Sequence, residues 1–513
     1  GIRNLSILAD AVTLVKQIEG IAVDIENVPL DDAKTFRMLA RGETVGLFQL
    51  NGSGMTRFLK ELKPTTIHDI NAMVALYRPG PMEMIPTYIE RKHNPHLISY
   101  LDPRMKSYLD MSYGLLVYQD DVMLTAIHLA GYSWLEADKL RKAMGKKIPA
   151  EMEAQKVKLF EGFAKGGLDQ KTADTLWKQI EPFAAYGFNK AHAASYGKVA
   201  YQTAYMKANF PAIYMSAVLT AESGDTEKVA EIIAECKRMK IPVLPPDINE
   251  SFEGFTVIKN YGTKTNAKGD TKPVDAIRFG LTTIKNFGEG IAHTIIDERK
   301  RGGPFTSLVD FLNRIKDRNL NKKSLESLIK CGAMDHLGER GHMLENLDDL
   351  LQYNKENAGS HEQDSLFGLM ADTSTIPTLR LRPAAPANMR DKLTWEKELL
   401  GLYVSGHPLD TYAEKLGKRD MTIKEVKETL KEGMMAVAYG VVEESKPILT
   451  KKGDKMLFVK IADLTGSIEA VVFPKILKDN EQHFMPDACI AIKGRLSARN
   501  GIPSIIVDKA KTL

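Results

Sequence analysis

Four cations cluster around the end of one predicted helix. Ser133 and Glu136 stand three residues apart in the pattern of a capping box, and Gly145 predicts where the helix ends. The four cations are Arg141, Lys142, Lys146 and Lys147. Because arginine makes forked contacts to phosphate and lysine supplies a point charge, the cluster indicates a phosphate-rich ligand. Cations near a helix C-terminus also complement the helix dipole, and the spacing alone leaves both interpretations open.

A run of aromatic and polar residues over 183–196 offers a second kind of chemistry. Its rings could stack on bases, while Asn189, Lys190 and His192 could supply polar and charged contacts. Aromatic residues at helical spacing are also typical of a packed core, which is the alternative interpretation.

Two glycines, Gly288 and Gly290, stand where a predicted helix begins after an apolar segment. This pattern is typical of a helix-hairpin-helix, in which glycines let backbone amides approach a DNA phosphate and the helix N-terminus adds its positive end. A second, degenerate copy is predicted within 325–338. Such a module holds phosphates without reading the base sequence. A glycine-rich connection between helices is the alternative.

Two further segments indicate binding by weaker signals. A glutamine followed by an apolar-aromatic pair can dock into a partner's pocket, and it can equally pin a linker to its own domain. That pentapeptide is Gln363, Asp364, Ser365, Leu366 and Phe367. Near the end of the chain, Lys451 and Lys452 lie in one predicted hairpin. Basic loops on a small barrel suit single-stranded nucleic acid, or they form a solvated rim.

The elements that must position these residues follow from the apolar periodicity. Residues 1–250 show three- and four-residue spacing, which predicts a continuous helical region. Residues 251–280 predict short strands, helices resume at Gly288, and 354–391 has the composition of a surface linker. From Met434 the period becomes two, which predicts a small barrel of the OB type. The expected fold is multidomain: mainly α-helical, then a helix-hairpin-helix region, then a C-terminal β-barrel.

The composition narrows the class of protein. The 513 residues carry a formal charge of +4, which fits a polyanionic partner without requiring one. Three distant cysteines argue against a disulfide framework and fit a reducing cytoplasm. No apolar run approaches the roughly 20 residues that span a bilayer, so no membrane is expected. The charged opening after Gly1 does not fit a signal peptide, and the sequence is expected to be part of a longer protein.

In their order along the chain, these stretches resemble the alpha subunit of bacterial DNA polymerase III, which is a C-family replicative polymerase. The resemblance covers essentially the whole chain and matches the family's C-terminal portion from the end of the palm onward. Its most specific motifs are Gly46-Leu47-Phe48-Gln49-Leu50, Leu76-Tyr77-Arg78-Pro79-Gly80-Pro81, Leu140-Arg141-Lys142-Ala143-Met144-Gly145, Tyr186-Gly187-Phe188-Asn189-Lys190, Leu244-Pro245-Pro246-Asp247 and Gly406-His407-Pro408. Independent motifs in the family's order argue against a chance match.

The resemblance implies that residues 1–250 are the end of the palm and the fingers, which cover the incoming nucleotide. A basic pair at the positions of Arg141 and Lys142 faces the triphosphate in that family, and Lys142 stands here where an arginine is expected. Three further residues and Arg78 are expected to line the same face: Asn189, Lys190 and His192.

The resemblance also implies a clamp-binding domain over 251–433 and an OB-fold domain over 434–513. Within the first, a tandem helix-hairpin-helix at about 277–338 holds duplex DNA through Gly288 and Gly290, and residues 363–367 bind the sliding clamp. The residues expected to contact DNA elsewhere are Lys146, Lys147, Lys451 and Lys452.

The implied activity is that of a DNA-directed DNA polymerase, exercised by the full subunit. The family holds Mg²⁺ with three aspartates that lie upstream of the position of Gly1, so no catalytic residue is expected in this chain, and the chain alone is expected to bind no metal and to be inactive. The implied partners are primer–template DNA, deoxynucleoside triphosphate, the sliding clamp and other subunits of the replicative holoenzyme. The competing hypotheses are a non-catalytic DNA-binding protein built from helix-hairpin-helix and OB modules, and a clamp-tethered hub.

Overall fold

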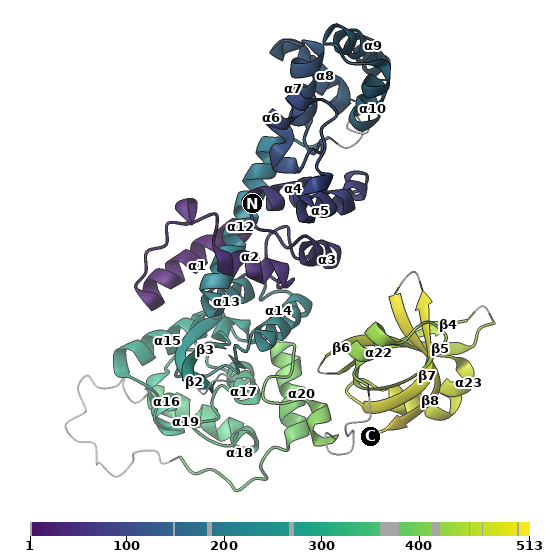
Figure 1. The fold of residues 1–513 in the computed structure, drawn as a ribbon. Coiled ribbons are helices and arrows are strands. Elements are labelled where there is room, and N and C mark those ends of the chain that lie inside the picture. The colour runs from purple at the N-terminus through teal and green to yellow at the C-terminus, as the bar shows by residue number, and fades with distance from the viewer. Residues whose placement is uncertain are drawn as a thin grey trace. The chain divides into compact units, whose positions relative to one another are not determined.

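The computed structural model forms two compact units (Figure 1). The first consists of Gly1–Pro242 and Phe255–Ile277, and the second of Val243–Gly254 and Arg278–Leu513. The structure describes residues 3–146, 149–181, 187–265, 271–359, 379–412, 421–450, 452–463, 465–499 and 502–513.

The first unit is almost entirely helical, as the spacing of its apolar residues predicts. Its α-helices are α1 (Arg3–Glu19), α2 (Ala33–Ala40), α3 (Ser53–Leu62), α4 (Ile67–Leu76), α5 (Ile85–His93), α6 (Lys106–Leu109), α7 (Gln119–Ala130), α8 (Trp134–Lys146), α9 (Pro149–Lys165), α10 (Gln170–Ile180), α12 (Lys190–Asn209), α13 (Pro211–Ala221) and α14 (Thr226–Arg238). Short 3₁₀ turns are η1 (Ile25–Asn27), η2 (Pro81–Met84), η3 (Pro95–Leu97), η4 (Pro103–Met105) and η5 (Asp110–Ser112).

Helix α12 is the central support of this unit. It packs against α2, α4 and α13 (Figure 1). The α4 contact is close because Gly197 has no side chain: a Cβ there would collide with the amide oxygen of Asn71. The N-terminus of α12 is thereby held against the loop that follows α4.

Helices α6 to α10 share a separate apolar core. Its fully buried members include Leu140 of α8, Phe163 of α9 and Leu176 of α10. The capping box of α8 forms as predicted, since Ser133 N donates to Glu136 Oε2 at 2.8 Å and Glu136 N donates to Ser133 Oγ. The predicted stop at Gly145 agrees with the structure to within one residue, since α8 ends at Lys146.

Two strands close the first unit. These strands, β2 (Thr256–Thr265) and β3 (Thr271–Arg278), are hydrogen-bonded neighbours in one sheet. Their positions match the short strands predicted over 251–280.

The second unit begins with helices that match the predicted middle region. Its elements before the barrel are β1 (Val243–Leu244), η6 (Leu281–Thr283), α15 (Glu289–Gly302), α16 (Leu308–Arg314), α17 (Lys322–Lys330), α18 (Arg340–Glu345), α19 (Leu347–Gly359), α20 (Met389–Leu400), η7 (Pro408–Tyr412) and α22 (Ile423–Thr429). The irregular stretch predicted over 354–391 is shorter at both ends, because α19 runs to Gly359 and α20 begins at Met389.

A closed barrel ends the second unit and confirms the predicted OB-type architecture. Its strands are β4 (Met435–Leu449), β5 (Lys455–Asp463), β6 (Gly466–Val472), β7 (Cys489–Arg499) and β8 (Ile502–Thr512), with α23 (Pro474–Asn480) and η8 (Glu481–Phe484) between β6 and β7. The order around the barrel is β4-β5-β6-β8-β7, and β6 pairs with β8 in parallel. Alternate residues such as Val459 and Ile461 point into the core.

The three cysteines are unpaired thiols, in agreement with the expectation from their spacing. Within the described ranges, no helix combines the length and the apolar character that a membrane crossing requires.

Candidate functional site

The basic pair on α8 is engaged by an acid of its own helix. Arg141 Nη2 lies 2.7 Å from Asp138 Oδ1, and Lys142 Nζ lies 2.8 Å from Asp138 Oδ2. Hydrogen bonds from Lys142 and then from Arg141 lower the pKa of the Asp138 carboxyl below its ordinary value. Arg141 is half-buried and Lys142 is exposed, with 39% of the Arg141 side chain and 59% of the Lys142 side chain accessible. The pair is therefore neutralised in part by Asp138, a contact that the sequence analysis did not include.

The other two cations of this cluster, Lys146 and Lys147, follow the basic pair along the chain. Lys146 is the last residue of α8. Lys147 lies outside the described residues.

The N-terminus of α12 is built by Asn189 and by the neighbouring helix α7. The Asn189 side-chain oxygen accepts a hydrogen bond from His192 N at 2.9 Å, which caps the helix. Lys190 N donates to Asp120 Oδ2 at 2.8 Å, and Lys190 Nζ lies 5.5 Å from the centre of the Tyr118 ring. The amide of Gln119 bonds to the carbonyl of Phe188 at 2.9 Å. Residues from two distant segments thus converge at this helix end.

A ladder of rings runs along the first turns of α12. The Phe188 and His192 rings meet edge to face at 5.1 Å, and the His192 and Tyr196 rings lie 4.2 Å apart. The guanidinium carbon of Arg78, in the loop after α4, lies 3.6 Å from the centre of the Phe188 ring. Lys190 and His192 are exposed, so their charged and polar atoms face solvent. The structure therefore brings together four of the predicted nucleotide-binding residues: Arg78, Asn189, Lys190 and His192.

Arg78 has an unusual environment for an arginine. It is half-buried, and burial lowers the pKa of its guanidinium. In the part of the chain that the structure describes, the Arg78 side chain has no hydrogen-bond or ion-pair partner. Its guanidinium instead makes a cation–π contact with the Phe188 ring. A desolvated cation without an acceptor is costly, so an anion supplied from outside would stabilise this position.

The loop before α7 is held by a buried carboxyl. Asp121 Oδ2 accepts hydrogen bonds from Val117 N and Tyr118 N, both at 2.9 Å, while Oδ1 has no partner among the described residues. Burial raises the pKa of Asp121 to about 6, against the lowering effect of those two amides. This carboxyl fixes the backbone from which Tyr118 and Asp120 reach α12.

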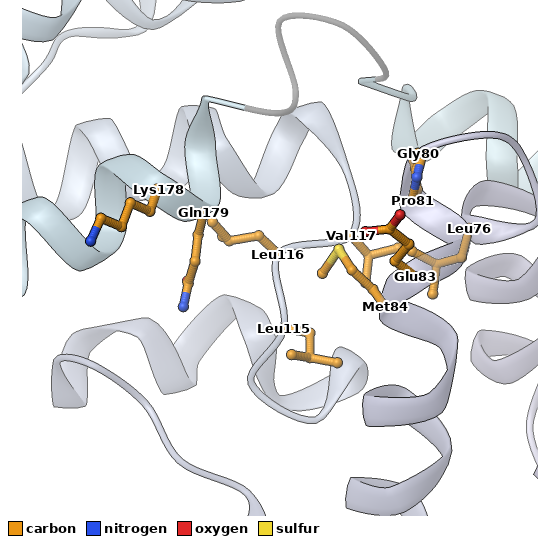
Figure 2. A pocket seen from close by; sticks show the side chains of 10 residues that line it. All are labelled: Leu76, Gly80, Pro81, Glu83, Met84, Leu115, Leu116, Val117, Lys178 and Gln179. Atoms are coloured by element: carbon orange, nitrogen blue, oxygen red, sulfur yellow. The ribbon is translucent and has the colours of Figure 1, made fainter.

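A cavity of about 580 Å³ is lined in part by residues on either side of Arg78 in the sequence (Figure 2). Its lining is mainly apolar and comes from Leu76, Gly80, Pro81, Glu83, Met84, Leu115, Leu116, Val117, Lys178 and Gln179. Gly80 has φ +96°, which lets the chain turn sharply into η2. Lys178 is a cation of the described lining, and its side chain extends away from Glu83 and Met84 in Figure 2. The lining suits an apolar group rather than a phosphate.

The basic pair on α8 and the cluster on α12 are separate in this structure. Within the described ranges, no hydrogen bond, ion pair or ring contact joins Arg141 or Lys142 to Arg78, Lys190 or His192. The sequence analysis named both groups but missed Asp138, although its spacing of three and four residues from the cations is a recognisable helical signal.

The predicted DNA-binding glycines lie at an exposed helix end. Gly288 is the N-cap of α15 and gives no side-chain cap to the first turn, and Gly290 follows inside that turn. A Cβ at Gly288 would meet nothing within 4 Å, and Lys285 next to it is exposed. Free amides, the positive helix end and a nearby lysine can together accept a phosphate group.

The second copy of the hairpin differs from the first. Helix α17 ends at Lys330, and Gly332 adopts φ +84°, as the predicted helix end requires. Gly332 is buried, and a Cβ there would collide with the guanidinium of Arg340. Its backbone packs against its own domain, whereas Gly288 faces solvent.

Two other predicted binding sites are the basic pair Lys451–Lys452 and the pentapeptide at 363–367. Lys452 is exposed in the turn between β4 and β5, and its amide donates to Thr450 Oγ1 at 3.3 Å. Lys451 and the pentapeptide at 363–367 lie outside the described residues. Among the residues that are described, no group of three or more His, Cys, Asp or Glu is placed to hold a metal ion.

Comparison with known protein families assigns all three regions. Residues 4–167 match the bacterial DNA polymerase III alpha subunit finger domain. Residues 240–343 match a helix-hairpin-helix motif, and residues 439–513 match an OB-fold nucleic acid binding domain.

Curated relatives match almost the whole chain. DNA polymerase III subunit alpha of Thermus aquaticus is 43% identical over 92% of this chain, and the match spans 38% of that protein. The proteins of the same name from Treponema pallidum and Aquifex aeolicus are 37% and 38% identical over 99% and 97% of this chain, and the matches span 42% and 40% of their lengths. The chain thus spans about two fifths of the length of these relatives. It belongs to the family of the DNA polymerase III alpha subunit, of which it carries the finger, helix-hairpin-helix and OB-fold regions.

Proposed function

We propose that this chain binds the triphosphate of an incoming deoxynucleotide at the N-terminus of α12, as the nucleotide-handling part of a replicative DNA polymerase. The observation that carries the proposal is Arg78, a half-buried cation stacked on Phe188 with no acidic partner among the described residues. Phosphate oxygens would supply the missing acceptors in a forked arrangement.

The rest of this site supports the same ligand. Lys190 and His192 are exposed on the first turn of α12, where the helix dipole favours a negative charge. Arg141 and Lys142 join the ligand in this proposal by exchanging Asp138 for a phosphate. Exposed ion pairs are weak and are screened by salt, so a polyanion can compete with a single carboxylate.

DNA is the second proposed ligand. The open N-terminus of α15 at Gly288 and Gly290 is proposed to hold duplex phosphates, and the Lys451–Lys452 hairpin of the barrel is proposed to lie near the single-stranded template. Lys146, the last residue of α8, and Lys147, which follows it in the sequence, are proposed to add charge along the DNA path.

The sliding clamp is the proposed protein partner, together with other subunits of the replicative holoenzyme. This proposal rests on the sequence of residues 363–367 alone. Changing Leu366 and Phe367 to Ala should abolish retention of the chain on immobilised clamp, while Gln352→Ala on α19 should leave it intact. Retention of the double variant would move the docking motif elsewhere.

Polymerisation itself is proposed for the complete subunit. Two-metal nucleotidyl transfer needs clustered carboxylates that hold Mg²⁺. The described residues do not provide such a cluster, so no step is assigned here to a metal held by this chain. We expect the 513 residues alone to bind nucleotide and DNA without extending a primer.

Equilibrium binding separates this proposal from its alternative. Titration of the chain with a fluorescent deoxyadenosine triphosphate, and separately with labelled primer–template, should give saturable binding of both. DNA binding without any triphosphate binding would instead favour a non-catalytic DNA-binding protein built from helix-hairpin-helix and OB modules.

A further inference from the structure

A cationic cavity lies away from the α12 N-terminus, within the first unit. Its volume is about 470 Å³. It is lined by Lys34, Arg37, Met38, Arg41, Glu43, Lys207, Ala208, Pro211, Arg238, Met239, Lys240 and Ile241. These residues come from α2 and the loop after it, from the end of α12, from the start of α13, and from the end of α14 and the loop after it. Helix α12 packs against α2 and α13, and α13 packs against α14 (Figure 1). Six of the lining residues are basic and one is acidic.

Half of these cations are balanced by internal acids. The buried Lys207 Nζ lies 2.6 Å from Glu235 Oε1 and also donates to the carbonyls of Glu43 and Val45. Arg238 bonds to Glu235 at 2.6 Å and to Glu43 at 3.1 Å. Arg41 bonds to Glu43 at 2.6 Å. Two carboxylates therefore serve three cations and fix the wall of the cavity.

The other three cations of the cavity have no acidic partner among the described residues. Lys34, Arg37 and Lys240 are exposed at the cavity, and in the described part of the chain none of them has an ion-pair partner. Lys240 stands at φ +62°, in the left-handed region that side chains rarely occupy. Three uncompensated charges thus accumulate beside three others that share two acids.

Stabilisation of the helix dipoles does not account for this set. Cations are favourable in the last turn of a helix, which explains Arg37 in α2 and Arg238 in α14. Lys34, however, lies in the first turn of α2, where a positive charge is unfavourable, and it is three residues from another cation.

From this juxtaposition we infer that the cavity is a second phosphate-binding site that accepts a chain of at least two phosphate groups. Lysine and arginine side chains bind phosphate oxygens directly. Consecutive phosphates of a nucleic acid strand and a free polyphosphate present the same chemistry. The site does not depend on the proposed nucleotide site at Arg78, so either can fail without the other.

The test uses the intact chain and removes only the unbalanced charges. Calorimetry measures the binding of inorganic pyrophosphate, and anisotropy measures the binding of a labelled single-stranded oligonucleotide. Both are measured on the chain with Arg78→Gln and on a cavity variant. The cavity variant carries Lys34→Gln, Arg37→Gln and Lys240→Gln in addition to Arg78→Gln. The Arg78→Gln background weakens the proposed nucleotide site, while the proposed DNA contacts on α15 and on the barrel are the same in every variant and cancel in the comparison. The control carries Lys16→Gln, Lys106→Gln and Lys171→Gln, which remove three exposed charges on α1, α6 and α10.

At least tenfold weaker binding in the cavity variant than in the control is expected for one of the two ligands or for both. Loss of oligonucleotide binding alone identifies a nucleic acid strand as the source, and loss of pyrophosphate binding alone identifies a free polyphosphate. Equal binding by cavity variant and control, with both melting at the temperature of the parent, overturns the inference. A cavity variant that melts lower than the control also overturns it, because the charges would then serve the fold.

Discussion

The guanidinium carbon of Arg78 lies 3.6 Å from the centre of the Phe188 ring, although Arg78 follows α4 and Phe188 follows α10 in the sequence. A second arginine, Arg57, lies over the adjacent Phe58 at 4.8 Å but is exposed to solvent. The two pairs have the same chemistry and differ in burial. That difference makes Arg57 a matched control for the role of Arg78.

Arg78→Gln should weaken triphosphate binding at least tenfold. A hydrogen bond to a charged group is worth about 1.5–3 kcal/mol, and the phosphate would lose its forked partner. Titration with a fluorescent deoxyadenosine triphosphate measures the loss, and Arg57→Gln should leave the affinity unchanged. An equal loss in both variants would mean that net charge alone attracts the ligand.

Asp138→Asn should strengthen triphosphate binding, since Arg141 and Lys142 would no longer share their charge with a carboxylate. Arg141→Ala should weaken it, so the two changes have opposite signs. The same titration measures both, with Asp174→Asn on α10 as a control for the loss of one exposed acid. If Asp138→Asn and Asp174→Asn shift the affinity alike, the basic pair has no part in nucleotide binding.

Gly288→Ala should lower DNA affinity without lowering the melting temperature. A Cβ at this position meets open space and φ is −80°, so the fold accepts it, but the methyl group stands between the amides of α15 and a phosphate. Anisotropy with duplex DNA measures the affinity. Gly224→Ala, in an equally open turn before α14, should change neither property. Unchanged DNA binding by Gly288→Ala would remove this helix end from the DNA contact.

Stability should depend on pH through Asp121. Its pKa is raised from 3.8 to about 6 in the folded protein, so the folded state holds this proton more tightly than the unfolded state. The resulting stabilisation is complete below about pH 4 and is lost as the pH rises through 6, a change on the order of 3 kcal/mol. Urea unfolding between pH 4 and pH 7 should show this fall in the parent relative to Asp121→Asn. Parallel curves for the two proteins would contradict the prediction.

Glu396→Ala should destabilise the second unit by about 3–5 kcal/mol, because it leaves a buried charge without one of its partners. Arg340 Nη1 lies 3.0 Å from Glu396 Oε1, and both side chains are at most 2% exposed. Glu396 also accepts hydrogen bonds from Val404 N and Ser405 N. Urea unfolding followed by circular dichroism measures the change, and Asp348→Ala in the exposed pair with Lys322 should cause none that is measurable. A similar effect of both variants would show that burial does not matter here.

Local patterns predict much of this fold. The barrel strands are readable because residues such as Val459 and Ile461 alternate with outward-facing ones, and the helices of the first unit are readable from their three- and four-residue spacing. The start of α8 was predicted from Ser133 and Glu136. Its end at Lys146 lies one residue beyond the predicted stop at Gly145, since a glycine weakens a helix without ending it at a fixed residue.

The residues of the candidate sites likewise include some that a local sequence pattern indicates and some that no local pattern indicates. Asp138 carried a local signal that was overlooked, since its distance in sequence from Arg141 and Lys142 places all three on one face. The stacking of Arg78 on Phe188 has no local signal, because it depends on the packing of α12 against α4. A cation without an acidic partner among the described residues, such as Arg78 or Lys240, can be recognised only once the positions of the neighbouring acids are known.

The pairing of β8 affects how the barrel assembles during synthesis. This strand bonds to β7 in an antiparallel arrangement and to β6 in parallel, so it covers one edge of each. Until the ribosome has released residues 502–512, those two edges are open and can pair with another nascent chain. The barrel therefore cannot close until β8 has left the ribosome, and a product stalled before this strand would be prone to aggregate.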